Sequence, residues 1–377
     1  MKSDDTLFDI VIVGSGVSAA AAMLAIEPLP IESLSIEPAP QHTHPLSIGV
    51  IAPQNKKKEG VGESLSPSAQ PILEKLGIWS LFLQEGHLSA QRSFSSWGTD
   101  QLIEKNMPPH LSKKGWCLNR EKFNKFVWKQ AEKTPHIRHL ARLTTFKNTG
   151  TEWEMKLSDR RIINARFILD CSGRHAVVAK KLTTRHRKTK MVALYNTLSS
   201  IDKGVEPTPG VLLEASMNGW WYSNLLPNGK MIVYFFTDPD LLPTNILQDK
   251  GIWQHLVSTS QYTLKRIISA GFSIETAPNI TNTGSSYAQQ FTGENWAAAG
   301  DAVAVFDPLS SHGITTALWS GYEAGQVARS ALNKDYDLML DYECTFREGI
   351  QQYKRELQQF YRQEHRFLDS VFWRRGQ

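Results

Sequence analysis

Closely spaced glycines near the N-terminus could hold a dinucleotide. They follow the apolar run 8–13 and form a G-x-G-x-x-A turn: Gly14, Ser15, Gly16, Val17, Ser18 and Ala19. Gly14 would permit a tight turn, Gly16 would let the backbone approach a pyrophosphate, and Ala19 would let the next helix pack closely on the strand. The N–H groups that begin this helix would face the phosphates. An incidental turn is the alternative, but the strand–turn–helix context favours dinucleotide binding.

Acidic residues at the ends of two further apolar runs could bind the hydroxyl groups of such a cofactor. Glu37 ends the run 34–37, where its carboxylate could accept hydrogen bonds from a ribose. Asp170 ends a later run and is followed by Gly173, so an acid and a glycine again form a turn that a ligand could approach. We expect Glu37, Asp170 and Gly173 to contact the cofactor.

A longer segment in the second half of the chain favours a flavin as part of this cofactor. Gly300 and Asp301 follow the apolar run 296–299, which places a carboxylate beside a ribose or ribityl hydroxyl. Pro308 and Gly313 would then shape a loop whose N–H groups could stabilise negative charge on a flavin ring. The dipole of the helix that follows would add to this effect.

An arginine at the start of a predicted helix could bind the pyrophosphate. Arg120 begins the amphipathic segment 120–132. Taken alone, this residue reads more simply as a surface arginine, so its assignment depends on the other motifs.

These motifs require an α/β fold, and the length of 377 residues, 41% of them hydrophobic, allows two intimately packed domains. We expect a Rossmann-like FAD-binding domain, an inserted and mostly antiparallel β-sheet domain for the substrate, and a helical C-terminal tail. The predicted division assigns 1–80, 119–190 and 286–334 to FAD binding, 81–118 and 191–285 to the substrate domain, and 335–377 to the tail.

Composition excludes several other classes of protein. The net charge of +5 is small, and no nucleic-acid-binding motif is present, so we expect no nucleic-acid partner. No apolar run is long enough for a membrane span, and the start of the chain lacks the pattern of a signal peptide. Three widely spaced cysteines argue against a disulfide scaffold. We therefore expect a cytoplasmic protein with no metal site.

In order and spacing, the motifs resemble those of the class A flavoprotein monooxygenases, and in particular their tryptophan-halogenase-like branch. The segment 60–67 resembles the G-x-G-E-S/A-x-x-P segment that borders the flavin in that branch, which implies that Glu63 and Ser64 contact FAD. The segment 219–227 resembles the Trp-rich strand that faces flavin and substrate. The resemblance spans nearly the whole chain and implies FAD and the fold, but not the substrate.

Two departures from the halogenase pattern change the expected chemistry. Halogenases of this branch carry a lysine in the strand after the first substrate helix, whereas the stretch 88–97 contains only Arg92. A permanently protonated guanidinium cannot form the haloamine that a lysine amine can form. The halogenase motif W-x-W-x-I-P is also altered in 219–227. We therefore expect oxygen transfer, for which FAD supplies the chemistry and the protein supplies a dry, oriented cavity.

Three residues are candidates for catalysis in this cavity. Trp220 and Tyr222 lie on the Trp-rich strand, and His312 lies on the loop expected beside the flavin. For the two aromatic residues, packing in the core is an equal alternative. The predicted cofactor-binding residues are Gly14, Gly16, Val17, Ser18, Ala19, Glu37, Glu63, Ser64, Arg120, Asp170, Gly173, Gly300, Asp301, Pro308, Gly313 and Ile314.

The chain is short for this branch, which implies an open pocket and a large substrate. It resembles the LodB- and GoxB-type flavoproteins, which accompany LodA- and GoxA-type amino-acid oxidases and help to build their cysteine tryptophylquinone. The resemblance implies hydroxylation of a protein-borne tryptophan on the oxidase precursor, with docking through a basic surface and the aromatic, basic tail 353–375. Hydroxylation of a small aromatic metabolite, a non-catalytic flavin-binding chaperone and a halogenase are the alternatives. Electrons would come from NAD(P)H or from a separate flavin reductase, and the oligomeric state stays open.

Overall fold

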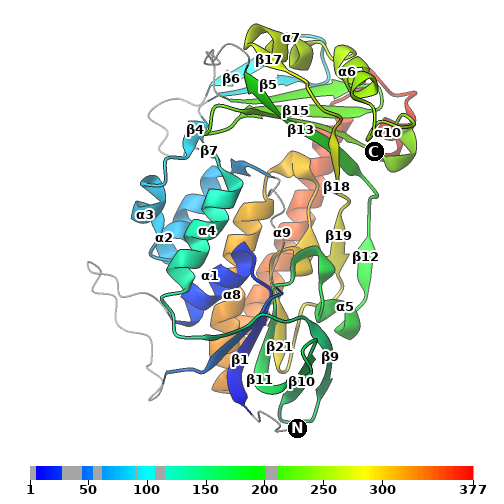
Figure 1. The fold of residues 1–377 in the computed structure, drawn as a ribbon. Coiled ribbons are helices and arrows are strands. Elements are labelled where there is room, and N and C mark those ends of the chain that lie inside the picture. Colours follow the sequence, from blue (N-terminus) through cyan, green and yellow to red (C-terminus); the bar gives the residue numbers. More distant parts are fainter. Residues whose placement is uncertain are drawn as a thin grey trace.

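Two eight-stranded sheets form the two ends of the molecule in the computed structural model (Figure 1). The structure describes residues 6–27, 45–53, 62–90, 92–106, 115–200 and 210–376. The expected α/β fold, with a Rossmann-like domain, a second sheet domain and a helical tail, is confirmed.

The first sheet has a parallel centre. Its order is β20-β21-β11-β1-β2-β8, the pairs from β21 to β8 are parallel, and β10 and β9 extend it from β11. Parallel strands that are covered on both faces form continuous apolar runs, which is what the glycine turn follows in the sequence. The strands are β1 (Leu7–Val13), β2 (Ile48–Ile51), β8 (Ile137–His139), β9 (Leu143–Asn148), β10 (Trp153–Leu157), β11 (Ile162–Asp170), β20 (Thr292–Gly293) and β21 (Trp296–Ala298).

A short strand that the sequence pattern did not indicate lies beside β1. The run 34–37, with Glu37, lies outside the described residues. Among the described strands, β2 pairs with β1 in parallel, on the side away from β11. All residues of β2 are buried, although it contains Gly49. A Cβ at Gly49 would lie 3.2 Å from the Phe8 ring, so this glycine lets the ring pack onto the strand. Glycine is unfavourable inside a strand, so the short run that contains Gly49 did not indicate β2 in the sequence.

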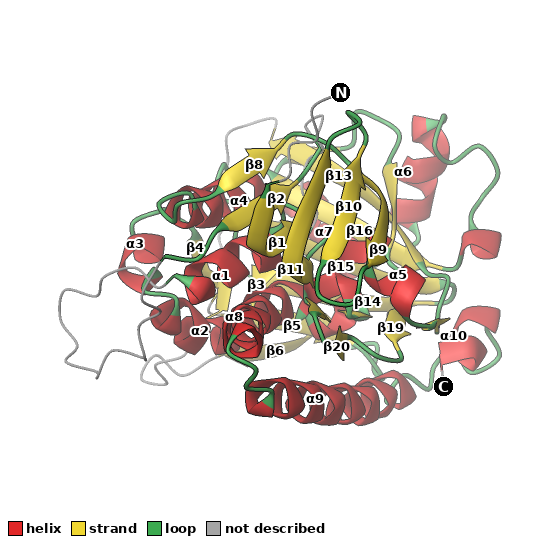
Figure 2. Cartoon of the chain, turned by 90° about the horizontal axis from the view of Figure 1, so that it is seen from below, coloured by secondary structure: helices red, strands yellow, loops and turns green. Residues whose placement is uncertain are grey.

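Three helices pack side by side against the first sheet (Figures 1 and 2): α4 (Arg120–Ala131), α1 (Val17–Ile26) and α8 (Gly313–Leu332). All residues of α1 are buried, and α8 lies against it almost without intervening side chains. A Cβ at Gly321 would lie 2.3 Å from the carbonyl oxygen of Ser18, and one at Gly325 would lie 2.6 Å from that of Ala22. These two glycines therefore set the separation of α1 and α8.

The second sheet has the order β17-β13-β16-β15-β14-β5-β6, with β18 paired to β13. The pairs among its described strands are antiparallel except β5–β14. The strands are β5 (Arg92–Ser96), β6 (Ile103–Asn106), β13 (Val192–Ser200), β14 (Val211–Ser216), β15 (Gly219–Leu225), β16 (Met231–Thr237), β17 (Phe272–Ser273) and β18 (Asn279–Asn282).

The two faces of the second sheet pack against different partners. On β15 and β16, Trp221 and Phe235 join the core beneath α6 (Lys250–Ser258) and α7 (Tyr262–Ser269). On the same strands, Tyr222 and Tyr234 project to the opposite face, because side chains alternate along a strand. This opposite face looks toward the first domain.

Short elements connect the two domains. Two three-stranded sheets lie between them, with the orders β12-β19-β22 and β3-β7-β4. Their strands are β3 (Ser64–Leu65), β4 (Leu88–Ala90), β7 (Gly115–Cys117), β12 (Arg185–Arg187), β19 (Ser286–Ala288) and β22 (Ala304–Val305). The remaining α-helices are α2 (Gln70–Lys75), α3 (Trp79–Leu83), α5 (Ala179–Leu182), α9 (Asp337–Arg362) and α10 (Val371–Gly376).

The tail ties the two domains together. Near its start, α9 packs Tyr342 and Phe346 into the core of the first domain. At its other end, Tyr361 joins Trp373 of α10 on the inner face of the second sheet. Within the described ranges, no helix combines the length and the apolar character that a bilayer crossing requires.

Candidate cofactor and substrate site

The glycine turn between β1 and α1 has the backbone geometry that a close ligand approach requires. Gly14 has a φ of +128°, and a Cβ there would lie 2.2 Å from the carbonyl oxygen of Cys171, so only glycine fits. Gly16 precedes α1 in an extended conformation, and a Cβ there would meet nothing within 4 Å. Neither a side-chain cap nor an acidic residue in the first turn occupies the N-terminus of α1. This end of the helix is therefore available to an anion.

The carboxylate of Asp170 organises the turn after β11. One of its oxygens accepts hydrogen bonds from the N–H and hydroxyl of Ser172, at 3.0 and 2.6 Å. The other accepts the N–H groups of Val178 and Ala179, at 2.8 and 2.7 Å. Both oxygens are thus engaged by the chain itself, and the turn presents Gly173, beside which there is open space.

Gly300 brings the end of β21 against α1 and α8. Its φ is +62°, its N–H donates to Ser320 Oγ at 2.8 Å, and a Cβ there would lie 3.0 Å from Ser18 Oγ. Ser18 therefore faces Gly300, so two of the motifs that are far apart in the sequence meet at the carboxyl ends of neighbouring parallel strands.

Two arginines surround Asp301. Arg185 donates to the carbonyl oxygens of Asp301 and Ala302 at 2.7 and 2.6 Å, and Arg174 Nε lies 3.5 Å from the Asp301 carboxylate. Burial raises the pKa of Asp301, and the positive charges of Arg174, Arg120 and Arg185 oppose that rise. The carboxylate is held beside the glycine turn by positive charge rather than by backbone donors.

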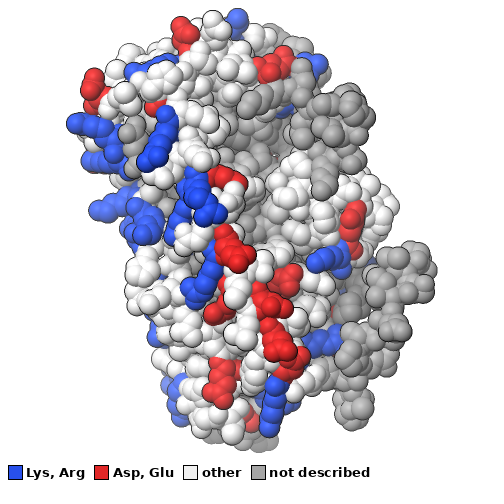
Figure 3. Space-filling view, turned by 180° about the vertical axis from the view of Figure 1, so that it is seen from behind, with Lys and Arg blue, Asp and Glu red and all other residues white. Residues whose placement is uncertain are grey.

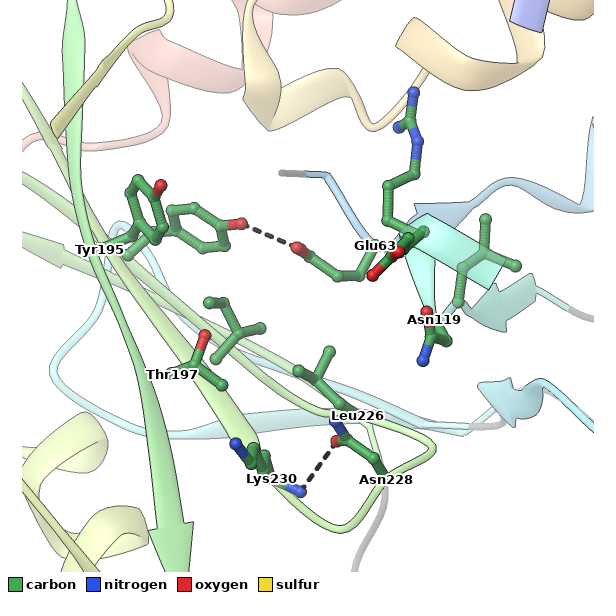
Figure 4. A pocket seen from close by; sticks show the side chains of 12 residues that line it. Glu63, Asn119, Tyr195, Thr197, Leu226, Asn228 and Lys230 are labelled. Carbon is green, nitrogen blue, oxygen red and sulfur yellow. Dashed lines mark hydrogen bonds between the residues drawn. The ribbon is translucent and has the colours of Figure 1, made fainter. Parts of the chain in front are cut away.

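A cavity of about 140 Å³ lies between the start of α4 and the inner face of the second sheet (Figure 4). Glu63 and Asn119 border it from the first domain, and Tyr195 and Tyr234 border it from β13 and β16. The hairpin between β15 and β16, with Lys230, forms its outer rim. Carboxylate, amide and phenol groups are therefore gathered at the domain interface.

Glu63 is the buried acid of this cavity. Its side chain is 5% exposed, and one carboxylate oxygen, Oε1, accepts the Tyr234 hydroxyl at 2.8 Å. Oε2 has no hydrogen-bond partner. Burial raises the pKa of Glu63 to about 7, although the Tyr234 hydrogen bond and the charge of Arg120 act to lower it. Arg120 is fixed by hydrogen bonds to the Gly62 carbonyl and to Asn124 Oδ1, both at 3.0 Å.

Tyr222 and Trp220 have different surroundings although both project from the same face of β15. The Tyr222 hydroxyl lies 2.7 Å from Ser64 Oγ, which joins the Trp-rich strand to the segment that carries Glu63. The structure packs Trp220 against Phe236, with ring centroids 3.9 Å apart, and its indole N–H donates to the Tyr361 hydroxyl. Trp220 does not line the cavity, whereas Tyr222 lies next to the segment that borders it.

The loop before α8 is held by two tyrosines of α9. The N–H of Asp307 donates to the Tyr353 hydroxyl at 2.7 Å, and the Tyr361 hydroxyl donates to the Asp307 carboxylate at 3.1 Å. Burial raises the pKa of Asp307 to about 6. Pro308 follows Asp307, and burial lowers the pKa of His312, the residue that precedes α8. The tail therefore fixes the loop that we expect beside the flavin.

The predicted residues gather in three neighbouring places. Gly14, Gly16, Val17, Ser18, Ala19, Asp170, Gly173, Gly300 and Asp301 lie at the carboxyl ends of β1, β11 and β21 or at the start of α1; Glu63, Ser64, Arg120 and Tyr222 lie at the domain interface; Pro308, His312, Gly313 and Ile314 lie at the start of α8. Glu37 lies outside the described residues, and β2 is followed by Ala52 and Pro53 rather than by an acid.

Sequence reasoning missed Tyr234, Arg185 and Asp307. Tyr234 lies in an apolar run in which every residue is buried, so the sequence does not show which face meets the cavity. Arg185 and Asp307 act through backbone contacts between residues far apart in the chain, for which no local pattern exists. Tyr234 is the one tyrosine in the segment 231–237, and no repeat of polar positions there marks it.

The chain is similar in sequence to one curated protein over nearly its full length. This is LodB of Marinomonas mediterranea, described as an FAD-dependent oxidoreductase, which is 21% identical over 98% of this chain and 96% of its own. No protein-family model matches the chain.

Solved structures share its fold at low sequence identity. The myxobacterial chondrochloren halogenase CndH matches with a TM-score of 0.81 at 17% identity, over 99% of this chain and 86% of its own. The flavin-dependent halogenase CmlS matches with a TM-score of 0.80 at 19% identity, over 100% and 68%. QhpG, a peptidyl tryptophan dihydroxylase essential for tryptophylquinone cofactor biogenesis, matches with a TM-score of 0.74 at 19% identity, over 98% and 79%.

Proposed function

We propose that this chain, which is similar to LodB and shares the fold of FAD-dependent halogenases, hydroxylates a tryptophan side chain of a partner protein during biogenesis of cysteine tryptophylquinone. The near full-length similarity to LodB and the fold shared with QhpG support a hydroxylase of this kind. The partner would be the precursor of an amino-acid oxidase.

The residues at the strand ends fit FAD. The open space beside Gly16 and the uncapped N-terminus of α1 suit a pyrophosphate, and Asp301 would bind a hydroxyl of the ribityl or ribose. The start of α8, with Gly313, would face the flavin ring with free N–H groups. Arg120 adds a fixed positive charge between these groups. When bound, FAD supplies the activation of oxygen.

Side chains of the second sheet would then orient the substrate. Tyr195 and Tyr234, which line the cavity from β13 and β16, present an aromatic wall on which an indole can pack. The buried carboxylate of Glu63 is the acceptor within this wall that remains available to a ligand.

Arg92, in the stretch where halogenases of this branch have a lysine, is the reason to expect oxygen transfer rather than halogen transfer. Arg92 lies on β5, is half exposed, and pairs with Glu104 at 3.6 Å. Its guanidinium cannot act as the amine that halogen transfer in this branch would need. Lys230 is exposed on the rim of the cavity, on a hairpin rather than on β5.

A cluster of positive charges on the surface is the feature that supports docking on another protein. The stretch 171–200 contains seven Lys or Arg residues and no Asp or Glu. Arg187, Lys188 and Lys190, which we call the basic strip, are exposed at the end of β12. Figure 3 shows Lys and Arg gathered at the upper left of the rear face, toward the side on which β12 lies in Figure 1. An acidic surface of the partner would be attracted to this region.

The aromatic part of the expected docking surface is corrected by the structure. Tyr353, Tyr361, Phe372 and Trp373 of the tail are buried, because they fill the core between α9, α10 and the two domains. The tail therefore holds the site together, and these four side chains are not available to a partner, whereas Phe360 and Phe367 are half-buried.

Co-expression with an amino-acid oxidase precursor tests the proposed function. We expect the tryptophan peptide of the precursor to gain the mass of one or two oxygen atoms only when the flavoprotein is present. Turnover of free indole compounds instead would favour a small-molecule hydroxylase, and precursor binding without any oxidation would favour a flavin-binding chaperone. A chlorinated peptide would favour a halogenase. The same assay, supplied with NAD(P)H alone or with an added flavin reductase, would identify the electron donor.

A further inference from the structure

We propose that Glu63 is the proton acceptor of the hydroxylation, and that Tyr234 is the residue that positions it. This inference rests on the proposed function and names the residue that removes the ring proton. It gives Glu63 a role different from the flavin contact that the family resemblance implies.

Glu63 differs from the other buried carboxylates in its unused oxygen. Asp170, Glu214, Asp307 and Glu364 are also buried, and in each both carboxylate oxygens have hydrogen-bond or ion-pair partners within the chain. Among the buried carboxylate oxygens that the structure describes, Glu63 Oε2 is the one without a partner. Leaving a buried charged group unpaired is costly, so this oxygen is better explained by a ligand than by folding.

The unused oxygen belongs to a group that lines the cavity. Figure 4 shows Glu63 and Tyr195 on opposite sides of the space, with a dashed hydrogen bond reaching the Glu63 carboxylate. Because that bond engages Oε1, the Tyr234 hydroxyl fixes the carboxylate while Oε2 stays available. The Gly62 N–H also lies 3.4 Å from the Tyr234 hydroxyl, so this hydroxyl is held from two sides.

The groups around Glu63 suit a base that works near neutral pH. Burial raises its pKa to about 7, and Arg120, from α4, and Tyr234, from β16, act against that rise. Tyr222 on β15 and Cys117 on β7 also face it, and burial raises the pKa of both, so they stay neutral. A base is most effective when its pKa lies near the working pH.

The reaction needs such an acceptor for one proton. Overall, one oxygen atom of O₂ enters the ring and the other leaves as water, with two electrons from a donor of the NAD(P)H class. As the C–O bond forms at an indole ring carbon, the O–O bond breaks and its electron pair stays with the second oxygen atom, which takes up protons and leaves as water. The ring carbon still carries its hydrogen at this point. The C–H bond then breaks, its electron pair restores the aromatic ring, and the proton goes to Glu63 Oε2. Glu63 releases this proton to solvent before the next turnover.

Glu63→Gln tests the base, with Glu132→Gln as the matched control. Glu132 is exposed at the end of α4 and pairs with Arg138 at 3.7 Å. We expect Glu63→Gln to bind FAD like the wild type and to lower the rate of hydroxylation of the co-expressed precursor by about 10² to 10⁴-fold. The control should be unaffected. Infrared spectra of the flavin-loaded protein should show a carboxylic acid that titrates near pH 7 in the wild type and is missing in Glu63→Gln.

Tyr234→Phe separates a positioning role from a structural one. The Tyr234 hydrogen bond lowers the pKa of Glu63, so its loss should move the acid limb of the pH–rate profile to higher pH. A merely structural role would lower the rate equally at every pH. Equal rates for Glu63→Gln and wild type, or loss of FAD from Glu63→Gln, would overturn this inference alone. A wild-type protein that leaves the precursor tryptophan unmodified would overturn the proposed function together with it.

Discussion

The close packing of α1 on α8 predicts opposite outcomes for the same substitution at two glycines. In Gly321→Ala, the new Cβ would lie 2.3 Å from the carbonyl oxygen of Ser18 and 2.9 Å from Ala21 Cβ. Atoms in ordinary contact are about 3.5 Å or more apart, so the two helices must separate. In Gly349→Ala, on α9, the new Cβ would meet nothing within 4 Å. Both substitutions replace a helical glycine by alanine, so the intrinsic helical gain of about 1 kcal/mol is shared.

The difference in stability between the two variants therefore isolates the strain. Overpacking of this kind costs about 1–3 kcal/mol, and Gly321→Ala should be less stable than Gly349→Ala by that amount. Gly349→Ala should be more stable than the wild type. Urea unfolding of the purified protein measures both values, with similar slopes expected for all three proteins. Because α1 and α8 both begin at the candidate site, Gly321→Ala should also retain less FAD. Equal unfolding midpoints for the two variants would refute the reasoning.

Two further predictions concern the tail and the surface. The pKa of Asp307 is raised to about 6 from an ordinary value of 3.8, so between these values the folded protein binds the proton more tightly than the unfolded chain. The free energy of unfolding should therefore fall by up to about 3 kcal/mol as pH rises from about 4 to 6. Asp307→Asn should lack this fall in thermal unfolding measured across that range. The same dependence of stability on pH in Asp307→Asn and wild type would contradict the raised pKa of Asp307. The double variant Lys188→Glu, Lys190→Glu should weaken association with the oxidase precursor in co-purification at low salt. Charge reversal of the exposed Lys129, on α4, and Lys133, just after it, should not. Equal losses in both pairs would argue against docking at the basic strip.

The fold was largely predictable because its main elements carry local signals. The glycine turn requires a strand before it and a helix after it, and α4 ends within a residue of the expected range. The expected helix after the Gly300 segment is also present as α8. These elements follow from residue patterns a few positions long, which a single sequence displays.

The strand β2 and the cavity could not be predicted, because they depend on contacts across the fold. Gly49 makes sense in β2 only once the Phe8 ring packs on it. The hydrogen bond between Tyr234 and Glu63 joins residues 171 positions apart. Helical spacing places Tyr353 and Tyr361 on the apolar face of α9, but no local pattern shows that this face meets Asp307.

The central claim is that this flavoprotein places oxygen on a tryptophan within another protein. Mass spectrometry of the tryptophan peptide, from oxidase precursor expressed with and without the chain, tests it most directly. We expect a gain of one or two oxygen atoms on that tryptophan with the wild-type chain, and little gain with Glu63→Gln. A peptide mass that is the same with and without the wild-type chain would contradict it.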